Sequence, residues 1–185
     1  MNSNKKILKF EHPARIAELD PENTLKRVGF KEGMTLCDIG AGTGIFSFAA
    51  AEISRNPIFA LDISDEMIRI LGKRKAERKI ENLIIKKVEY SDLPIDSESC
   101  DFALMITVLH ELEEPNIMMQ EIKRVLKKGG KLFVIEFYKK KSLTGPPFDH
   151  RISEEKVDEL WEENGFKKIE KFKMSENFYG VVLKI

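Results

Sequence analysis

The sequence is poor in the residues that build disulfide frameworks and metal sites. It has 2 cysteines, Cys37 and Cys100, and 3 histidines that lack the spacing of metal ligands. Both cysteines fall in expected strands, so we expect buried thiols rather than a disulfide, in a reducing cytoplasm. No apolar run approaches the ~18 residues of a membrane span, and the polar start of the chain is not followed by the apolar core of a signal peptide. We therefore expect a cytoplasmic protein with no metal and no membrane segment.

An excess of charge of either sign is also absent. Lys plus Arg number 31 and Asp plus Glu number 31, which gives a formal net charge of zero. A protein that follows the phosphates of nucleic acid carries a basic excess, so we expect no nucleic-acid partner. The 185 residues, 42% of them hydrophobic, are enough for the core of one domain, which we expect over residues 1–185.

The most informative stretch is residues 35–44, where a short apolar run ends in Asp38 and glycines follow at Gly40, Gly42 and Gly44. An apolar helix resumes at residue 45, so the pattern predicts a strand, a tight turn and a helix start. Glycines lack Cβ, so a ligand can lie against the backbone there, and the helix start presents free N–H groups. Open α/β sheets bind nucleotides at such a crevice. A glycine-rich turn alone is a weak signal, so the flanking residues must support it.

Further along the chain, apolar strands alternate with amphipathic helices. Residues 1–19 carry few strong signals. Expected strands cover 35–38, 57–62, 83–88, 101–106 and 132–135, followed by a hairpin of 166–174 and 178–183. Expected helices cover 20–29 and 45–54, and others begin at Ser64, at Pro115 (ending at Gly129–Gly130) and at Ser153 (ending at Asn164–Gly165). Residues 139–147 form a basic loop that we interpret as a lid. The pattern predicts a three-layer α/β sandwich.

The flanking acids distinguish between nucleotide classes. The glycines read Gly-x-Gly-x-Gly, whereas dinucleotide sites use Gly-x-Gly-x-x-Gly. Asp38 would repel a pyrophosphate and attract an ammonium group. Asp62 ends the second strand, where an acid can accept hydrogen bonds from both hydroxyls of a ribose, and Glu89 and Tyr90 follow the third strand where a base would lie. The site therefore favours a positively charged nucleoside.

These motifs resemble those of the class I S-adenosylmethionine-dependent methyltransferases, in particular the small-molecule branch that includes the ubiquinone/menaquinone-biosynthesis C-methyltransferases. The resemblance covers residues 33–137. It rests on Asp38–Gly44, Leu61–Ser64 with Met67 behind it, Glu89–Ile95 running into Cys100–Phe102, and Leu126–Leu132. It implies a Rossmann-like, seven-stranded, mostly parallel sheet in the order 3-2-1-4-5-7-6 with one antiparallel strand. It also implies an N-terminal lid or helical segment (1–30), a cofactor-binding core (31–137), and a lid loop, helix and hairpin (138–185).

The resemblance also implies roles for individual residues toward S-adenosyl-L-methionine. Asp38 would hold the methionine end, and Asp62 the ribose. Ile63 and Met67 would contact the adenine, Glu89 and Tyr90 its edge. Gly40, Gly42 and Gly44 would shape the turn, and Thr107 would contribute backbone near the sulfonium. Glu89–Tyr90 departs from the Asp-Ala that the family often shows at the adenine position.

Proton transfer is harder to assign. His110 follows the fourth strand and could take a proton from a methyl acceptor near neutral pH, as could His150; the alternative is a surface histidine satisfied by a carboxylate or water. Lys139–Lys141 is either a solvated run or a contact for an anionic acceptor. Phe10, His12 and Arg15 belong either to a lid or to an irregular packing segment.

We therefore expect a methyltransferase that acts on a small molecule by in-line displacement. Two alternatives stay open, a non-catalytic partner protein that binds the cofactor and a nicotinamide-dependent oxidoreductase.

Overall fold

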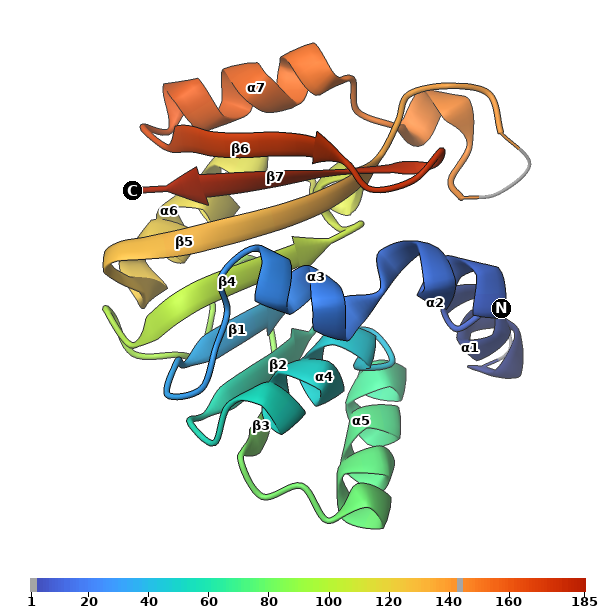
Figure 1. Ribbon diagram of the computed structural model, residues 1–185, viewed down its shortest axis with the longest axis vertical. Coiled ribbons are helices and arrows are strands. Elements are labelled where there is room, and N and C mark those ends of the chain that lie inside the picture. Colours follow the sequence, from blue (N-terminus) through green and yellow to red (C-terminus); the bar gives the residue numbers. More distant parts are fainter. Residues whose placement is uncertain (1–2, 143–144) are drawn as a thin grey trace.

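The computed structural model describes residues 3–142 and 145–185. This part of the chain forms a seven-stranded sheet in the order β3-β2-β1-β4-β5-β7-β6 (Figure 1). Among the described strands, β7 runs antiparallel to both of its neighbours, β5 and β6, and the other neighbouring pairs are parallel. The strands are β1 (Leu36–Ile39), β2 (Ile58–Asp62), β3 (Leu83–Lys87), β4 (Cys100–Ile106), β5 (Leu126–Phe137), β6 (Lys167–Lys173) and β7 (Phe178–Lys184). The predicted fold class, strand order and antiparallel strand are confirmed.

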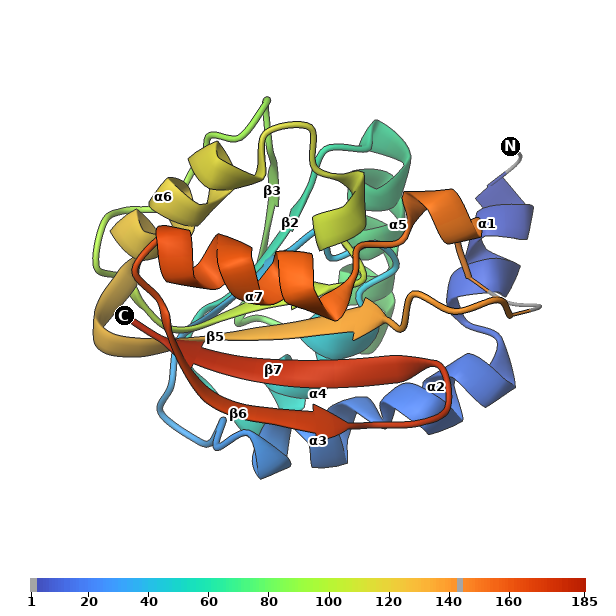
Figure 2. The ribbon, with the colours of Figure 1, turned by 90° about the horizontal axis from the view of Figure 1, so that it is seen from above.

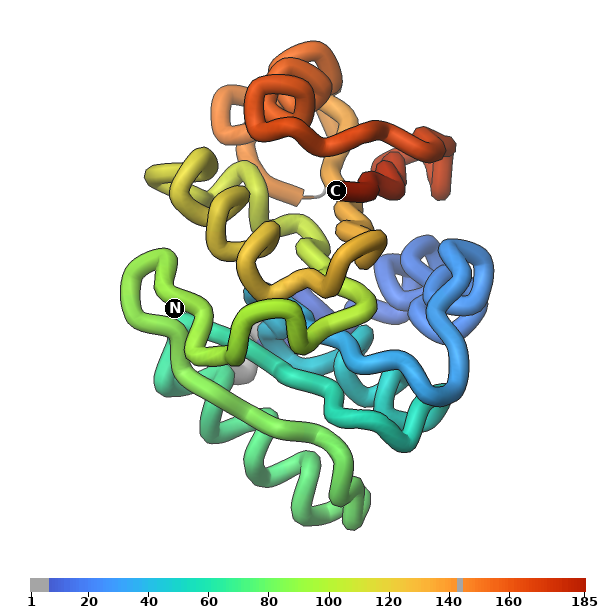
Figure 3. Tube along the Cα trace, turned by 90° about the vertical axis from the view of Figure 1, so that its left-hand side faces the viewer, coloured from blue at the N-terminus to red at the C-terminus, as the bar shows by residue number. Residues whose placement is uncertain are grey.

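Helices cover both faces of the sheet. They are α1 (Ser3–Phe10), α2 (Pro13–Leu19), α3 (Pro21–Arg27), α4 (Ile45–Ile53), α5 (Asp65–Arg78), α6 (Pro115–Val125) and α7 (Glu154–Glu163), with short 3-10 turns η1 (Leu109–Glu111) and η2 (Phe148–His150). Figure 2 shows α3 and α4 on one side of the sheet and α6 and α7 on the other. In Figure 3 the C-terminal hairpin and α7 lie at one end of the sheet, α5 and β3 at the other. The central strands are covered on both faces, which explains their continuous apolar runs.

Each face has its own apolar core. On one face, Phe46 and Phe48 of α4 contact sheet residues such as Phe102. On the other, Ile122 of α6 and Trp161 of α7 cover Met105, Val134 and their neighbours. Cys37 and Cys100 are free and buried in the second core, as predicted.

Residues 3–19, which carry few local signals, form two short helices. Between β3 and β4 the described chain has only turns and a bridge between Glu89 and Asp92. One boundary differs from the sequence prediction. Helix α6 ends at Val125, before the predicted glycine pair, because Leu126 already begins β5 and pairs with Cys100. The register of this pair then shifts, and β5 continues through both glycines.

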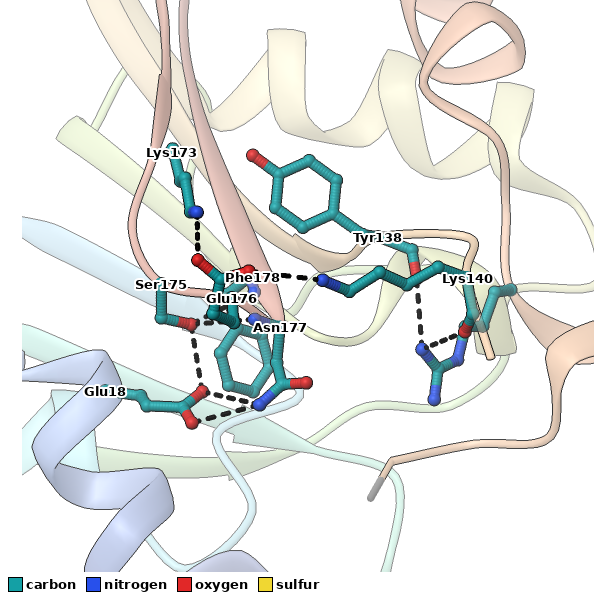
Figure 4. Close-up of polar contacts among 9 residues, drawn as sticks. Glu18, Tyr138, Lys140, Lys173, Ser175, Glu176, Asn177 and Phe178 are labelled. Atoms are coloured by element: carbon teal, nitrogen blue, oxygen red, sulfur yellow. Dashed lines mark hydrogen bonds and ion pairs between the residues drawn. The ribbon is translucent and has the colours of Figure 1, made fainter. Parts of the chain in front are cut away.

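The N-terminal helices lie beyond the carboxyl ends of the parallel strands (Figures 1 and 2). Polar contacts fix them from two sides. The Glu18 carboxylate of α2 accepts hydrogen bonds from Ser175 Oγ (2.9 Å) and Asn177 Nδ2 (3.0 Å) in the β6–β7 turn (Figure 4). Arg74 of α5 pairs with Glu11 and donates to the carbonyl of Thr43 in the glycine turn. None of the helices described is both long and apolar enough to cross a bilayer.

Candidate active site

A cavity of about 680 Å³ lies at the carboxyl ends of β1, β2 and β4. The glycine turn forms part of its lining, and Phe10 and Arg15 of the N-terminal helices contribute from the opposite side. Most of the predicted site residues line this cavity: Asp38, Gly40, Gly42, Asp62, Ile63, Met67, Tyr90 and Thr107. Gly44, Glu89 and His110 are not among its lining residues.

Asp62 is held rigidly by the backbone on both sides. The N–H of Gly42 donates to Oδ2 and the N–H of Ser64 donates to Oδ1, both at 2.8 Å. Its side chain ends β2, next to the turn that follows β1. Each carboxylate oxygen has a second lone pair, so Asp62 can still accept two hydrogen bonds from a ligand in the cavity.

Asp38 is buried, with 2% of its surface exposed. Burial raises the pKa of its carboxyl to about 7; the charge of Asp62 adds to this rise, and the hydrogen bond from Ser47 opposes it. That hydroxyl, from the first turns of α4, donates to Oδ2 at 2.5 Å. The structure thus contains a carboxyl group that ionises near neutral pH and would be stabilised by a cationic ligand.

The three glycines of the turn meet three different requirements. A Cβ on Gly40 would lie 2.4 Å from Cγ2 of Val108, so this residue allows β4 to approach. A Cβ on Gly44 would lie 2.6 Å from Leu71, so it allows α5 to pack on the start of α4. A Cβ on Gly42, which lines the cavity, would make only ordinary van der Waals contacts, at 4.0 Å to the carbonyl oxygen of Gly40 and to the ring of Phe10. No close packing requires this glycine, and its positive φ of 57° shapes the turn beside the cavity.

Two apolar residues of the cavity lining are unusually exposed. Ile63 is 66% exposed and Tyr90 is 93% exposed, and both line the cavity, with buried Met67 behind them. Tyr90 and Thr107 both have a φ of 57°, a conformation that costs energy for residues with a Cβ and is found at functional sites. An exposed apolar rim of this kind suits a flat heterocycle.

His110 forms a buried pair with Glu136, a residue that the sequence analysis did not select. Nδ1 of His110 lies 3.0 Å from both carboxylate oxygens of Glu136, and the pair is 5% and 2% exposed at the side chain. Burial lowers the pKa of His110, but the hydrogen bond and charge of Glu136 outweigh it, and the pKa is raised. Nε2 faces Glu111, 3.9 Å from its Oε1, and Glu111 lines the cavity.

The other basic candidates lie elsewhere. His12 caps α2 through its Nδ1, which accepts from the N–H of Ala14, and His150 ends the exposed turn η2. Lys139 and Lys140 line a separate shallow hollow with Tyr138 and Phe148. Residues 143–144 of the predicted lid loop lie outside the described residues. Among those described, no group of three or more His, Cys, Asp or Glu could hold a metal ion.

Comparison with known proteins decides the family. A family model described as "Methyltransferase domain" matches residues 30–179. The chain belongs to the methyltransferase-domain family. A crystal structure of a SAM-dependent methyltransferase from Aquifex aeolicus has a TM-score of 0.92 and 29% identity, and the match covers 100% of this chain and 99% of that one. The predicted class of S-adenosylmethionine-dependent methyltransferases, and with it the cofactor, is confirmed.

Curated relatives of this methyltransferase-family protein are longer than the chain. An uncharacterized protein of Methanocaldococcus jannaschii is 36% identical over 71% of this chain and 64% of its own length. The ubiquinone/menaquinone biosynthesis C-methyltransferase UbiE of Rhizobium etli is 31% identical over 67% of this chain and 46% of its own length. The chain thus spans about half to two thirds of the curated relatives that it matches. The [4+2]-cyclase SpnF shares the fold, with a TM-score of 0.80 at 20% identity.

The cavity fits S-adenosylmethionine on three observations. Gly42 lines it with backbone that carries no Cβ, the held Asp62 carboxylate keeps acceptor capacity for ribose hydroxyls, and Ile63 and Tyr90 offer exposed apolar surface for a purine.

Proposed function

We propose that this protein transfers the methyl group of S-adenosylmethionine to a small-molecule acceptor by in-line displacement. The observation that supports this most strongly is Asp62, whose two oxygens are both held by backbone N–H groups at the edge of the cavity that Gly42 also lines. The bound cofactor supplies a methyl group already activated by its sulfonium charge. The chain's own task is therefore to align the reactants and exclude water.

The proposed roles follow the chemistry of each side chain. Asp62 binds the ribose hydroxyls, and Asp38 binds the ammonium group at the methionine end. The remaining cofactor contacts that we propose are apolar or backbone contacts from Gly40, Gly42, Gly44, Ile63, Met67, Glu89, Tyr90 and Thr107. Of these, Gly44 acts indirectly, because its lack of a Cβ lets α5 pack against the turn.

His110 is the residue we propose for accepting a proton, where the methyl acceptor has one to lose. Glu136 engages Nδ1, so Nε2 is the nitrogen left for proton transfer. Because Nε2 faces Glu111 rather than the cavity itself, the proton would reach His110 by way of that carboxylate. The N-terminal helices would exclude water from the cavity, because Phe10 of α1 and Arg15 of α2 contribute to its lining.

A small-molecule acceptor is supported by the balanced charge of the chain and by relatives named as ubiquinone/menaquinone biosynthesis C-methyltransferases. Their acceptor is not carried over, because the chain spans only part of their length. We also propose a cytoplasmic location, in keeping with two buried thiols that remain unpaired.

Isothermal calorimetry tests this proposal. Wild-type protein should bind S-adenosylhomocysteine and fail to bind NADH. Asp62→Ala should weaken binding by about 1–3 kcal/mol, the value of charged hydrogen bonds, whereas Asp96→Ala, on an exposed turn, should not. NADH binding without S-adenosylhomocysteine binding would refute the proposal. Tight cofactor binding with no turnover over a broad acceptor panel would favour a non-catalytic partner protein instead.

A further inference from the structure

The segment between β3 and β4 contributes one wall of the cavity. Val88, Tyr90 and Ser91 of this segment line it. The segment forms turns rather than a strand or a helix, and its start is fixed by the N–H of Val88, which donates to the carbonyl of Asp62 at 3.0 Å. Tyr90 has a φ of 57°, which a residue with a Cβ keeps only where its surroundings hold it. The wall therefore depends on contacts from other elements.

Two side chains of α6 hold the continuation of this segment. Glu121 and Arg124 lie one helical turn apart and form a two-pronged ion pair, with Nε donating to Oε1 at 2.8 Å and Nη2 donating to Oε2 at 2.7 Å. Arg124 also donates to the carbonyls of Leu93 and Ile95, both at 2.7 Å. Oε2 of Glu121 accepts from the N–H of Leu93 at 3.0 Å. The ion pair thus binds three backbone groups that follow the cavity wall.

The local sequence explains why side chains must supply these bonds. Leu93 and Ile95 are buried in the apolar core that also contains Ile122 of α6, and buried backbone polar groups need partners. Pro94, between them, has no N–H to offer a neighbouring strand. Its carbonyl accepts from Nζ of Lys86 at 2.6 Å. Three successive carbonyls therefore accept from cationic side chains, two of them from the same guanidinium.

The ion pair lies close enough to the cavity wall to set its position. Leu93, which both members of the pair bind, is two positions after Ser91. The hydrogen bond from Arg124 lowers the pKa of the Glu121 carboxyl, burial opposes this, and the N–H of Leu93 adds to it, so the carboxylate is charged at neutral pH. A planar guanidinium that bridges a carboxylate and two carbonyls forms all of its bonds in one geometry only. A shift of this backbone would move the wall.

We propose that Glu121 and Arg124 are positioning residues for the cofactor site, an inference that rests on the proposed function. Neither side chain lines the cavity. They act by holding residues 88–91 where the adenine of the cofactor would lie. If the ion pair served only to stabilise the fold, its loss would lower the melting temperature and leave the affinity of the folded protein unchanged.

Calorimetry with two nucleosides tests the proposal. S-adenosylhomocysteine and 5′-methylthioadenosine share the adenosine, and only the former carries the amino-acid end. Arg124→Gln should weaken the binding of both by a similar factor, about 5- to 30-fold. Arg124→Lys, which keeps the charge but loses the planar fork, should fall between wild type and Arg124→Gln. Amide hydrogen exchange in residues 88–95 of the ligand-free protein should be faster in Arg124→Gln than in wild type.

Lys127→Gln is the matched control. Lys127 of β5 forms an ion pair with Asp101 at 2.9 Å, and its side chain is 42% exposed, against 33% for Arg124. It does not line the cavity. Lys127→Gln should therefore bind both nucleosides like wild type and leave the exchange of residues 88–95 unchanged. Melting temperatures give the loss of stability in each variant, and calorimetry is carried out well below them.

The outcomes separate this inference from the proposed function. If Arg124→Gln melts at a lower temperature but binds both nucleosides like wild type, the positioning role is overturned and the proposed function is not. Equal weakening in Lys127→Gln, or weakening confined to S-adenosylhomocysteine, overturns it as well. If Arg124→Gln does not fold, Arg124→Lys decides by the same comparison. Wild-type protein that binds neither nucleoside would overturn the proposed function and this inference together.

Discussion

The buried carboxyl of Asp38 should make cofactor binding release protons. With a pKa of about 7, raised by burial, close to half of the Asp38 side chains carry a proton at pH 7. A ligand ammonium group stabilises the ionised form, so the pKa falls when the ligand binds. Binding at pH 7 should therefore release about 0.5 proton per ligand from this site.

The same shift predicts how the ligand-free protein responds to pH. The ordinary pKa of an aspartate carboxyl is 3.8, and the pKa of Asp38 in the folded protein is about 7. Between these two pH values, the unfolded chain has lost the Asp38 proton while the folded chain keeps it. The free energy of unfolding therefore falls as pH rises through this window and levels off above it. A shift of about three units corresponds to about 4 kcal/mol at this site. Asp38→Asn, which does not titrate, should remove this part of the slope.

Two measurements test the reasoning. Calorimetry of S-adenosylhomocysteine at pH 7, in two buffers of different ionisation enthalpy, gives the number of protons released. Asp38→Asn should lose that release together with affinity, and 5′-methylthioadenosine, which lacks the amino-acid end and its ammonium group, should release none in the wild type. Urea denaturation at pH 5 and pH 8 gives the slope of stability. Equal proton release in wild type and Asp38→Asn, or equal slopes, would refute the account of Asp38.

Two further predictions concern residues around the cavity. Glu136→Gln removes the charge that raises the pKa of His110, so the rising limb of the pH profile of kcat/KM should move to lower pH. If this limb does not move, His110 is not the base that titrates there. Gly40→Ala should cost about 2–4 kcal/mol in urea denaturation, because it combines a positive φ with a clash against Val108. Gly33 has a similar positive φ, but a Cβ there would meet nothing within 4 Å, so Gly33→Ala should cost only about 1 kcal/mol. Equal losses of stability in the two variants would contradict the contribution of the contact with Val108.

The central strands and the glycine turn were predictable because their signals are local. Continuous apolar runs mark strands covered on both faces, and the glycines mark the bend between Asp38 and α4. Local signals could not give the bounds of α1 and α2, because both helices are short and are fixed by distant partners, such as Thr107 for Arg15 and Asn177 for Glu18. The end of α6 was misplaced because the pairing of Leu126 with Cys100 across the sheet overrides the glycine signal.

Ser47 and Glu136 show what sequence reasoning could still have found. Ser47 is a hydroxyl inside the apolar run that opens α4, and its partner is the Asp38 carboxyl. Glu136 is an acid near the end of an apolar strand, the pattern that selected Asp38 and Asp62, yet it was not selected because no cofactor role was expected at β5.

Three strands of the sheet thus carry an acid at or near the carboxyl end, and their partners separate their chemistry. Asp62 is bonded by two backbone N–H groups, which hold its two oxygens in place for the ribose hydroxyls that we propose it binds. Asp38 is buried and accepts a hydrogen bond from a single hydroxyl, that of Ser47. Its pKa is therefore raised to about 7, and a cationic ligand would stabilise its ionised form. Glu136 faces an imidazole and therefore stabilises a proton on His110. If these residues have the roles we propose, the strand order would place the ribose, the ammonium group and the proton acceptor in sequence along the edge of the sheet, from β2 through β1 to β5.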